Sequence, residues 1–172
     1  MSCNARRVSS TAAYLADHVF PDVAVRQWVL SVPFELRLLL ARRADALNAV
    51  GRIFVEEVFR WQRERASELG ITAARSGAVW FPQRFGGSLN LNVHYHVAVA
   101  DGVFTRPNPG VRADFDRLPR PSRPDLDDVA ARVETRVMRW LRRRRLVSPA
   151  KTTPAANASC ATALGRPLVS SD

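Results

Sequence analysis

Two histidines separated by one residue form the part of this sequence best suited to chemistry. His94 and His96 lie in residues 89–99, LNLNVHYHVAV, where apolar and polar residues alternate. This alternation is typical of a β-strand, in which residues two apart project from the same face. We therefore expect Asn90, Asn92, His94 and His96 to share one face and the apolar residues to share the other. Two neighbouring neutral imidazoles can bind a divalent cation if a third ligand joins them.

Several residues are candidates for that third ligand: Gln83, Asp101, Glu56 and Glu57. Simple alternation argues against Gln83, because it places this residue on the same side as the apolar residues Val79, Phe81 and Phe85. A bulge at Pro82 would reverse that side. The residues alone leave the identity of the third ligand open. His18 stands apart from the pair, and for it we expect a surface or packing role.

The elements that must position the pair can be predicted from the surrounding pattern. A strand over 25–32 precedes a long helical region over 34–69, which we expect to break near 43–45 and to end at Gly70. A second strand over 77–85 contains Pro82, which favours an edge position or a bulge. The turn at 86–87 then predicts an antiparallel pairing with the histidine strand. Whether the histidine strand continues through Asp101 and Gly102 into 103–104 is left open.

The following segment changes in character. Residues 105–124 contain five prolines among charged residues, so we expect a linker without a core of its own. Ser122 and Asp125 then have the spacing of a capping box, and an amphipathic helix over 125–146 follows. It ends in Arg142, Arg143, Arg144 and Arg145, four cations that either contact phosphate groups or form a solvated helix end. The tail over 147–172 is rich in Pro, Ala, Ser and Thr, which predicts disorder.

Composition limits the class of protein. The 172 residues carry a formal net charge of +10 from 26 Lys and Arg against 16 Asp and Glu, which favours a polyanionic partner, most simply nucleic acid. Mutational bias toward arginine is the alternative explanation of that charge. The two cysteines cannot form a disulfide framework. No apolar run is long enough for a membrane span or a secretion signal, so we expect a cytoplasmic, nucleoid-associated protein without membrane contact.

Three stretches resemble the HUH-class rolling-circle insertion-sequence transposases, the two-tyrosine family: RQWVLSVPFELRLLLA, GAVWFPQRFGGSLNLNVHYHVAVADGVF and RVMRWLRRRRL. The name HUH denotes histidine, a hydrophobic residue and histidine, which His94-Tyr95-His96 fits. The resemblance covers roughly Ser9 to Leu146. It implies an α+β fold, an incomplete RRM-like palm in which an antiparallel sheet has helices packed on one face.

The resemblance also implies a chemistry. The two histidines would hold Mg²⁺ or Mn²⁺, and Gln83 occupies the position of the third ligand. The metal polarises a phosphate of single-stranded DNA at insertion-sequence ends, and a tyrosine on a later helix attacks it. On this basis we expect DNA contacts from the hairpin and from the end of the basic helix: Arg84, Asn90, Asn92, Arg142, Arg143, Arg144 and Arg145.

Two features depart from the family pattern. The family's nucleophilic tyrosines lie beyond this chain, and neither Tyr14 nor Tyr95 is positioned to replace them. Residues 1–10 resemble only the last part of the family's zinc-binding module. The sequence therefore predicts a transposase truncated at both ends: a core over 11–104, a linker over 105–124, the basic helix over 125–146 and a disordered tail. It would bind metal and DNA without a catalytic tyrosine. The alternatives are a non-catalytic DNA-binding regulatory fragment and a non-functional remnant.

Overall fold

The computed structural model describes residues 22–86, 90–106, 110–147 and 164–165. The expectations for residues 1–21, including the zinc-module remnant, His18 and Tyr14, lie outside these residues, as does nearly all of the expected disordered tail. None of the helices in the described ranges combines the length and the apolar character needed to cross a membrane.

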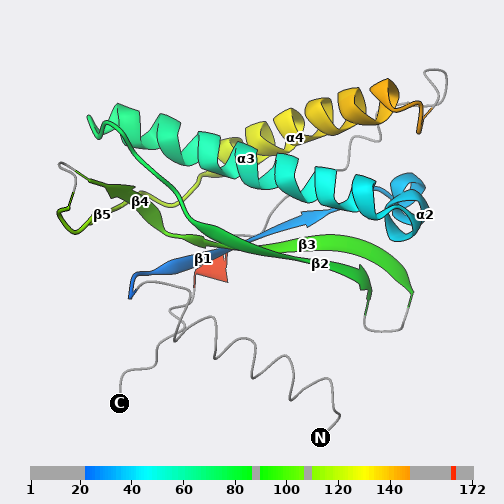
Figure 1. Cartoon of the computed structure of the whole chain (residues 1–172), viewed down its shortest axis with the longest axis horizontal. Helices are drawn as coiled ribbons and strands as arrows, with labels where there is room; N and C mark the ends of the chain where they lie inside the picture. Colours follow the sequence, from blue (N-terminus) through cyan, green and yellow to red (C-terminus); the bar gives the residue numbers. More distant parts are fainter. Residues whose placement is uncertain (1–21, 87–89, 107–109, 148–163, 166–172) are drawn as a thin grey trace, which may run out of the picture.

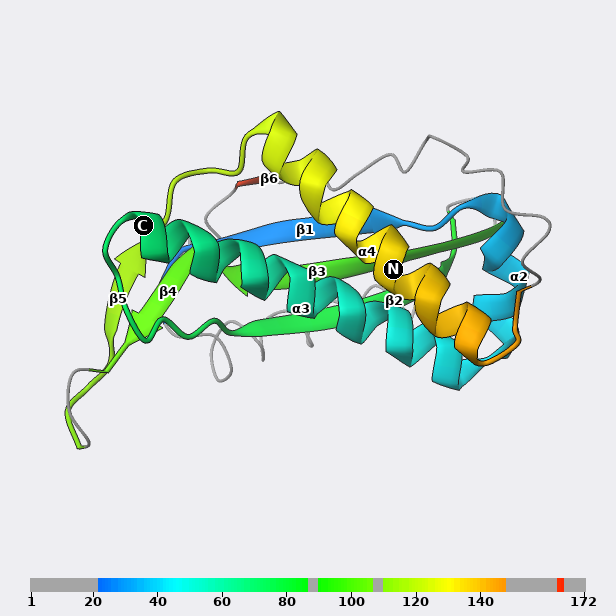
Figure 2. The same ribbon diagram turned by 90° about the horizontal axis from the view of Figure 1, so that it is seen from above.

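A sheet and a layer of helices make up the α+β architecture. The sheet is antiparallel and has the order β2-β3-β1-β6, formed by β2 (Ala78–Phe85), β3 (Leu91–Ala100), β1 (Val25–Ser31) and β6 (Leu164–Gly165). Helices α3 (Ala44–Glu68) and α4 (Arg123–Arg143) lie on one face of this sheet, and α2 (Phe34–Arg42) lies at one end of it (Figures 1 and 2). The antiparallel sheet with helices is confirmed, and every described helix is on the α3 side or at the sheet's end.

Alternation in the central strand divides the sheet into two faces. Four residues of β3 have no exposed surface and form the core with the helices above them: Val93, Tyr95, Val97 and Val99. In β1, which pairs with β3, the buried residues are Arg26, Trp28 and Leu30, and the residues between them are only half-buried. The predicted strands over 25–32, 77–85 and 89–99 are therefore confirmed, with boundaries shifted by one or two residues.

The helical region breaks where the sequence predicts. Arg43 adopts an extended conformation between α2 and α3 (φ −117°, ψ 99°), so α2 ends at Arg42. Helix α3 ends at Glu68 with Leu69 as its C-cap, and Gly70 has a φ of +76°, a conformation that favours glycine. The Ile71 amide donates to the Ala66 carbonyl at 2.9 Å, which closes the helix end. Gly51 allows α3 to approach the sheet, since a Cβ there would lie 2.6 Å from the Trp80 ring.

The segment after the histidine strand answers one question that the sequence leaves open and differs from one prediction. The strand does not continue past Ala100, because β4 (Gly102–Thr105) belongs to a second sheet with β5 (Asp114–Arg117). The expected linker over 105–124 therefore contains a strand, and its Leu118 is 4% exposed in a small cluster with Ala66 and Val103. The prolines flank β5 and do not interrupt it, so the backbone of residues 114–117 remains able to pair.

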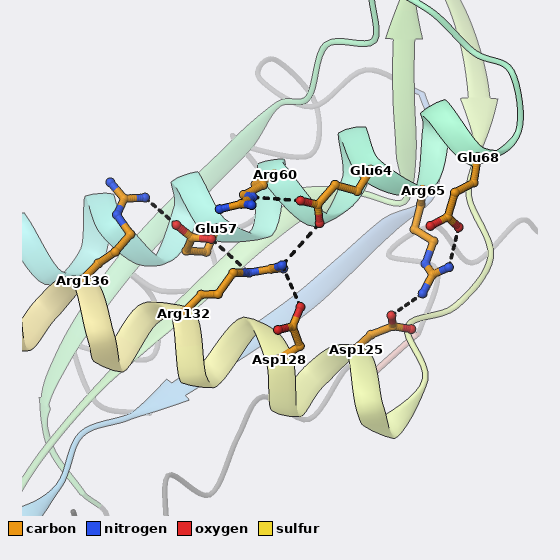
Figure 3. Close-up of polar contacts among 9 residues, drawn as sticks. All are labelled: Glu57, Arg60, Glu64, Arg65, Glu68, Asp125, Asp128, Arg132 and Arg136. Atoms are coloured by element: carbon orange, nitrogen blue, oxygen red, sulfur yellow. Dashed lines mark hydrogen bonds and ion pairs between the residues drawn. The ribbon is translucent and has the colours of Figure 1, made fainter.

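Helix α4 begins at the predicted capping box, in which the Ser122 side chain accepts from the Asp125 amide and the Asp125 carboxylate accepts from the Ser122 amide. It packs along α3, and ion pairs connect the two helices (Figure 3). At their centre is Glu57, which is 1% exposed. Its carboxylate lies 2.6 Å from Arg136 Nη1 and 3.2 Å from Arg132 Nε. This contact fixes the helix layer that supports the sheet from the side opposite to the histidines.

Candidate metal and nucleic-acid site

The two histidines lie side by side on the sheet face that the described helices leave uncovered. The ring centroids of His94 and His96 are 4.8 Å apart, and the rings meet edge to face at 70°. Both residues are half-buried, whereas Val93, Tyr95 and Val97, which alternate with them, are fully buried. The expectation that the two imidazoles project from the same face is confirmed.

Hydrogen bonds hold both rings through the Nδ1 atom. His94 Nδ1 lies 2.7 Å from the Asn92 carbonyl oxygen. Because a carbonyl only accepts, His94 carries its proton on Nδ1 and presents Nε2 as a lone-pair donor. His96 Nδ1 lies 2.7 Å from Gln27 Nε2. An amide nitrogen only donates, so in this arrangement His96 accepts at Nδ1 and carries its ring proton on Nε2. Burial, and next to it the neighbouring His94, lower the pKa of His96 and favour the neutral form that binds metals.

Gln83 lies directly opposite His94. In the β2–β3 register, Gln83 pairs with His94 and Phe81 pairs with His96. Directly opposed residues in an antiparallel pair project from the same face, so Gln83 joins the histidine face. Its Nε2 donates to the Phe85 carbonyl at 3.1 Å, which leaves Oε1 as the atom able to bind a cation. No bulge at Pro82 is needed, since the register shifts only beyond Gln83.

The alternation argument against Gln83 was wrong for a simple reason. It correctly grouped Gln83 with Phe81 but took the apolar members of this group as the sign of the core face. The core side of β2 instead carries Ala78, Trp80 and Pro82, which pair with Val99, Val97 and Tyr95. Phe81 is 40% exposed, so its side of the strand is not the core side.

The other candidates for the third ligand have different partners. Asp101 accepts from the buried Arg26 Nε at 2.6 Å, next to the β3–β4 junction. Glu56 and Glu57 face Arg136 on α4, in the helix layer on the opposite side of the sheet. Among the described residues, no group of three or more His, Cys, Asp or Glu side chains is arranged to hold a metal ion. Gln83 is the candidate that the strand register places opposite His94.

Tyr95, between the two histidines, is a core residue. It has no exposed surface, and its hydroxyl donates to the Leu47 carbonyl at 3.0 Å. Burial raises the pKa of this phenol well above its usual value. A buried, protonated phenol cannot attack a phosphate on the opposite face of the sheet.

The residues expected to contact DNA lie at one end of the molecule but on two sides of the sheet. Arg84, Asn90 and Asn92 belong to the end of the β2–β3 hairpin, and Asn90 accepts from the Gly86 amide at 2.9 Å through its backbone carbonyl. The C-terminal end of α4 lies at the same end of the molecule, beside α2 (Figure 1). Arg142, Arg143, Arg144 and Arg145 are exposed there, and none of them forms an ion pair with a described residue. The Arg144 guanidinium lies over the Trp140 ring, 5.2 Å from its centroid.

Two neighbours of the pair were not anticipated from the sequence. Gln27 of β1 holds the His96 ring, and Phe81 of β2 lies across from it. Alternation in VRQWVLS already separates Gln27 from the apolar Trp28 and Leu30, but only the strand register brings it to His96.

Comparison with known proteins found no match to this chain. No family model matches it, and neither a curated protein nor a solved structure does.

Proposed function

We propose that the protein contains the metal-binding and DNA-binding core of an HUH-class single-strand DNA transposase, and that it binds DNA without cutting it. The observation that carries this proposal is the placement of His94 and His96 on the sheet face opposite the described helices, with Gln83 across from His94. The resemblance of the surrounding sequence to that class supplies the reaction in which such a pair takes part.

The donor set fits a divalent cation. His94 offers Nε2 and Gln83 offers Oε1. His96 would offer Nε2 once the Gln27 amide turns by half a turn, so that Oε1 replaces Nε2 at His96 Nδ1. Two imidazoles favour Mn²⁺ over Mg²⁺, because Mg²⁺ prefers oxygen ligands and gives up its water reluctantly. A bound ion would act as a Lewis acid on a phosphate oxygen.

Nucleic acid is the partner class that the charge favours, and the sequence resemblance narrows it to single-stranded DNA. The net charge is +10, and the exposed arginines at the end of α4 can contact phosphates in pairs. Strand cleavage would require a nucleophile. Within the described residues, the one tyrosine is the buried Tyr95, so this part of the chain supports binding and not cleavage.

Titration with Mn²⁺, followed by calorimetry and by the loss of the free-ion electron paramagnetic resonance signal, tests the metal site. We expect one ion per chain. His94→Ala should abolish binding and Gln83→Ala should weaken it about 10- to 100-fold, the effect typical of losing a metal-site partner. Asn48→Ala, at an exposed position of α3, is the control and should leave binding unchanged. Equal Mn²⁺ binding by wild type and His94→Ala would refute the site.

Incubation with single-stranded hairpin DNA and Mn²⁺ tests the second half of the proposal. A mobility shift under native conditions is expected, without cleaved DNA or a covalent adduct on a denaturing gel. A covalent protein–DNA adduct would contradict the statement that the chain does not cut.

A further inference from the structure

We propose that Phe81 is a stacking platform for one base of the single-stranded DNA whose phosphate lies at the histidine pair. This inference rests on the proposed function and adds the way in which the site holds the nucleotide. Phe81 is 40% exposed and pairs directly with His96 across the β2–β3 ladder.

Phe81 and the histidine pair are close enough for a single nucleotide to contact both. Directly opposed residues of antiparallel strands have Cβ atoms about 4.5–5.5 Å apart. The Phe81 ring is therefore adjacent to the imidazoles, on the same face. The site could therefore contact one nucleotide at two points. The phosphate would lie at His94 and His96, and its own base or a neighbouring base would lie over Phe81. Aromatic rings bind bases of any type because every base has a flat π-face.

Phe81 lies outside the hydrophobic core, whereas its neighbour Trp80 packs against that core. Trp80 projects from the opposite face and packs against Tyr95, with ring centroids 6.0 Å apart. Removal of the Phe81 ring should therefore leave the core intact. Weaker DNA binding by a variant without this ring would then indicate a binding role of Phe81 and not a structural one.

The surroundings of Phe81 favour a nucleotide over an apolar partner. Its face also carries the His96 ring, the Gln27 amide that holds it, and the amide of Gln83. These polar groups can bind phosphates, cations and base edges, and an apolar protein surface would remove them from water at a cost in free energy. The net charge of +10 further matches a polyanion.

Equilibrium binding of a short oligothymidylate with one 2-aminopurine, measured with Mn²⁺ at several salt concentrations, tests the inference on the full chain. Phe81→Leu keeps apolar volume but removes the π-face. We expect it to weaken binding about 10-fold and to abolish the quenching of 2-aminopurine, whereas Phe81→Trp preserves both. The dependence of affinity on salt should not change, since no phosphate contact is lost. Phe34→Leu, on α2 and 76% exposed, is the matched control and should leave binding unchanged.

The outcomes separate this inference from the proposed function. If wild type and Phe81→Leu bind DNA equally, the stacking platform is refuted while DNA binding stands. If neither binds DNA, both the platform and the DNA part of the proposed function are refuted, and the Mn²⁺ titration still decides the metal site. A lower melting temperature of Phe81→Leu with unchanged DNA affinity, or self-association lost in this variant, would overturn the inference in favour of a protein surface covering Phe81.

Discussion

The side chain of Gln27 determines which His96 nitrogen is available. An amide N–H donated to Nδ1 leaves the ring proton on Nε2, which then cannot bind a metal. Rotation of the amide by half a turn instead presents Oε1, which accepts from Nδ1–H and leaves the Nε2 lone pair free. In the structure Gln27 Nε2 is the atom that lies 2.7 Å from Nδ1, which is the first of these arrangements. In the proposed metal site, the turned amide of Gln27 would therefore position the metal-binding form of His96.

Gln27→Leu should weaken Mn²⁺ binding about 10-fold, because the His96 ring loses the acceptor that fixes its tautomer. Gln27→Glu should bind at least as tightly as wild type, since a carboxylate accepts from Nδ1–H without rotation. Titration of both variants, with ¹⁵N spectra of the imidazoles to report the tautomer, measures the effect. Ser31→Ala serves as the control, because Ser31 lies on the same strand as Gln27 and pairs with His94 of β3. Unchanged Mn²⁺ affinity in Gln27→Leu would show that Gln27 does not position the ring.

At the scale of the elements, the contact between α3 and α4 depends on one buried carboxylate. Glu57 is 1% exposed and is approached by Arg132 and Arg136 (Figure 3). Glu64 of the same helix is also paired with Arg132, but its side chain is 44% exposed. Solvent screens the second contact and not the first. The two glutamates thus differ in burial more than in chemistry.

Glu57→Gln should lower the free energy of unfolding by about 3 kcal/mol, because it leaves two arginines against a neutral amide. Glu64→Gln should lower it by less than about 1 kcal/mol. Urea unfolding followed by circular dichroism measures both, and neither change should alter Mn²⁺ binding at the opposite face of the sheet. Equal destabilisation by the two substitutions would contradict the assigned role of burial.

The elements and the antiparallel pairing of β2 with β3 could be predicted from local patterns, whereas the strand registers and the β4–β5 pairing could not. Period-two alternation around His94 and the capping box at Ser122 are encoded by neighbouring residues, so β3 and the start of α4 followed from the sequence. The side of β2 that carries Gln83 depends on its register with β3, and here exposed Phe81 was taken for a core residue. The strand β5 depends on pairing with β4, which proline content could not reveal. Gln27 reaches His96 only through the β1–β3 register.

At the scale of the whole molecule, charge is unevenly distributed along α4. The acidic residues of this helix all precede Thr135, and Arg139, Arg142, Arg143, Arg144 and Arg145 follow it. Several other arginines of the helix layer are paired, Arg60 with Glu64 and Arg123 with Asp127, for example. A cluster of arginines without a described acidic partner therefore lies at the end of the molecule where the paired ends of β2 and β3 also lie (Figure 1).

Removal of two arginines from the end of α4 should weaken DNA binding more than removal of two paired ones. For Arg142→Ala/Arg143→Ala we expect the slope of log affinity against log salt to fall by about 1.4, or about 0.7 for each lost phosphate contact with a single strand. Arg60→Ala/Arg123→Ala changes the net charge equally and should leave the slope nearly unchanged. Fluorescence anisotropy over a salt series measures both. The same decrease in the two variants would indicate that only total charge matters.

The off-centre charge at the end of α4 has a consequence for the kinetics of association. The electric field of a polyanion orients a protein whose excess positive charge lies at one end before the two molecules touch. Most encounters would therefore begin at the charged end of the protein. The arginine end would then make the first contact, and the strand would reach the imidazoles by a short local movement. Lowering the ionic strength should consequently accelerate capture more than it slows release.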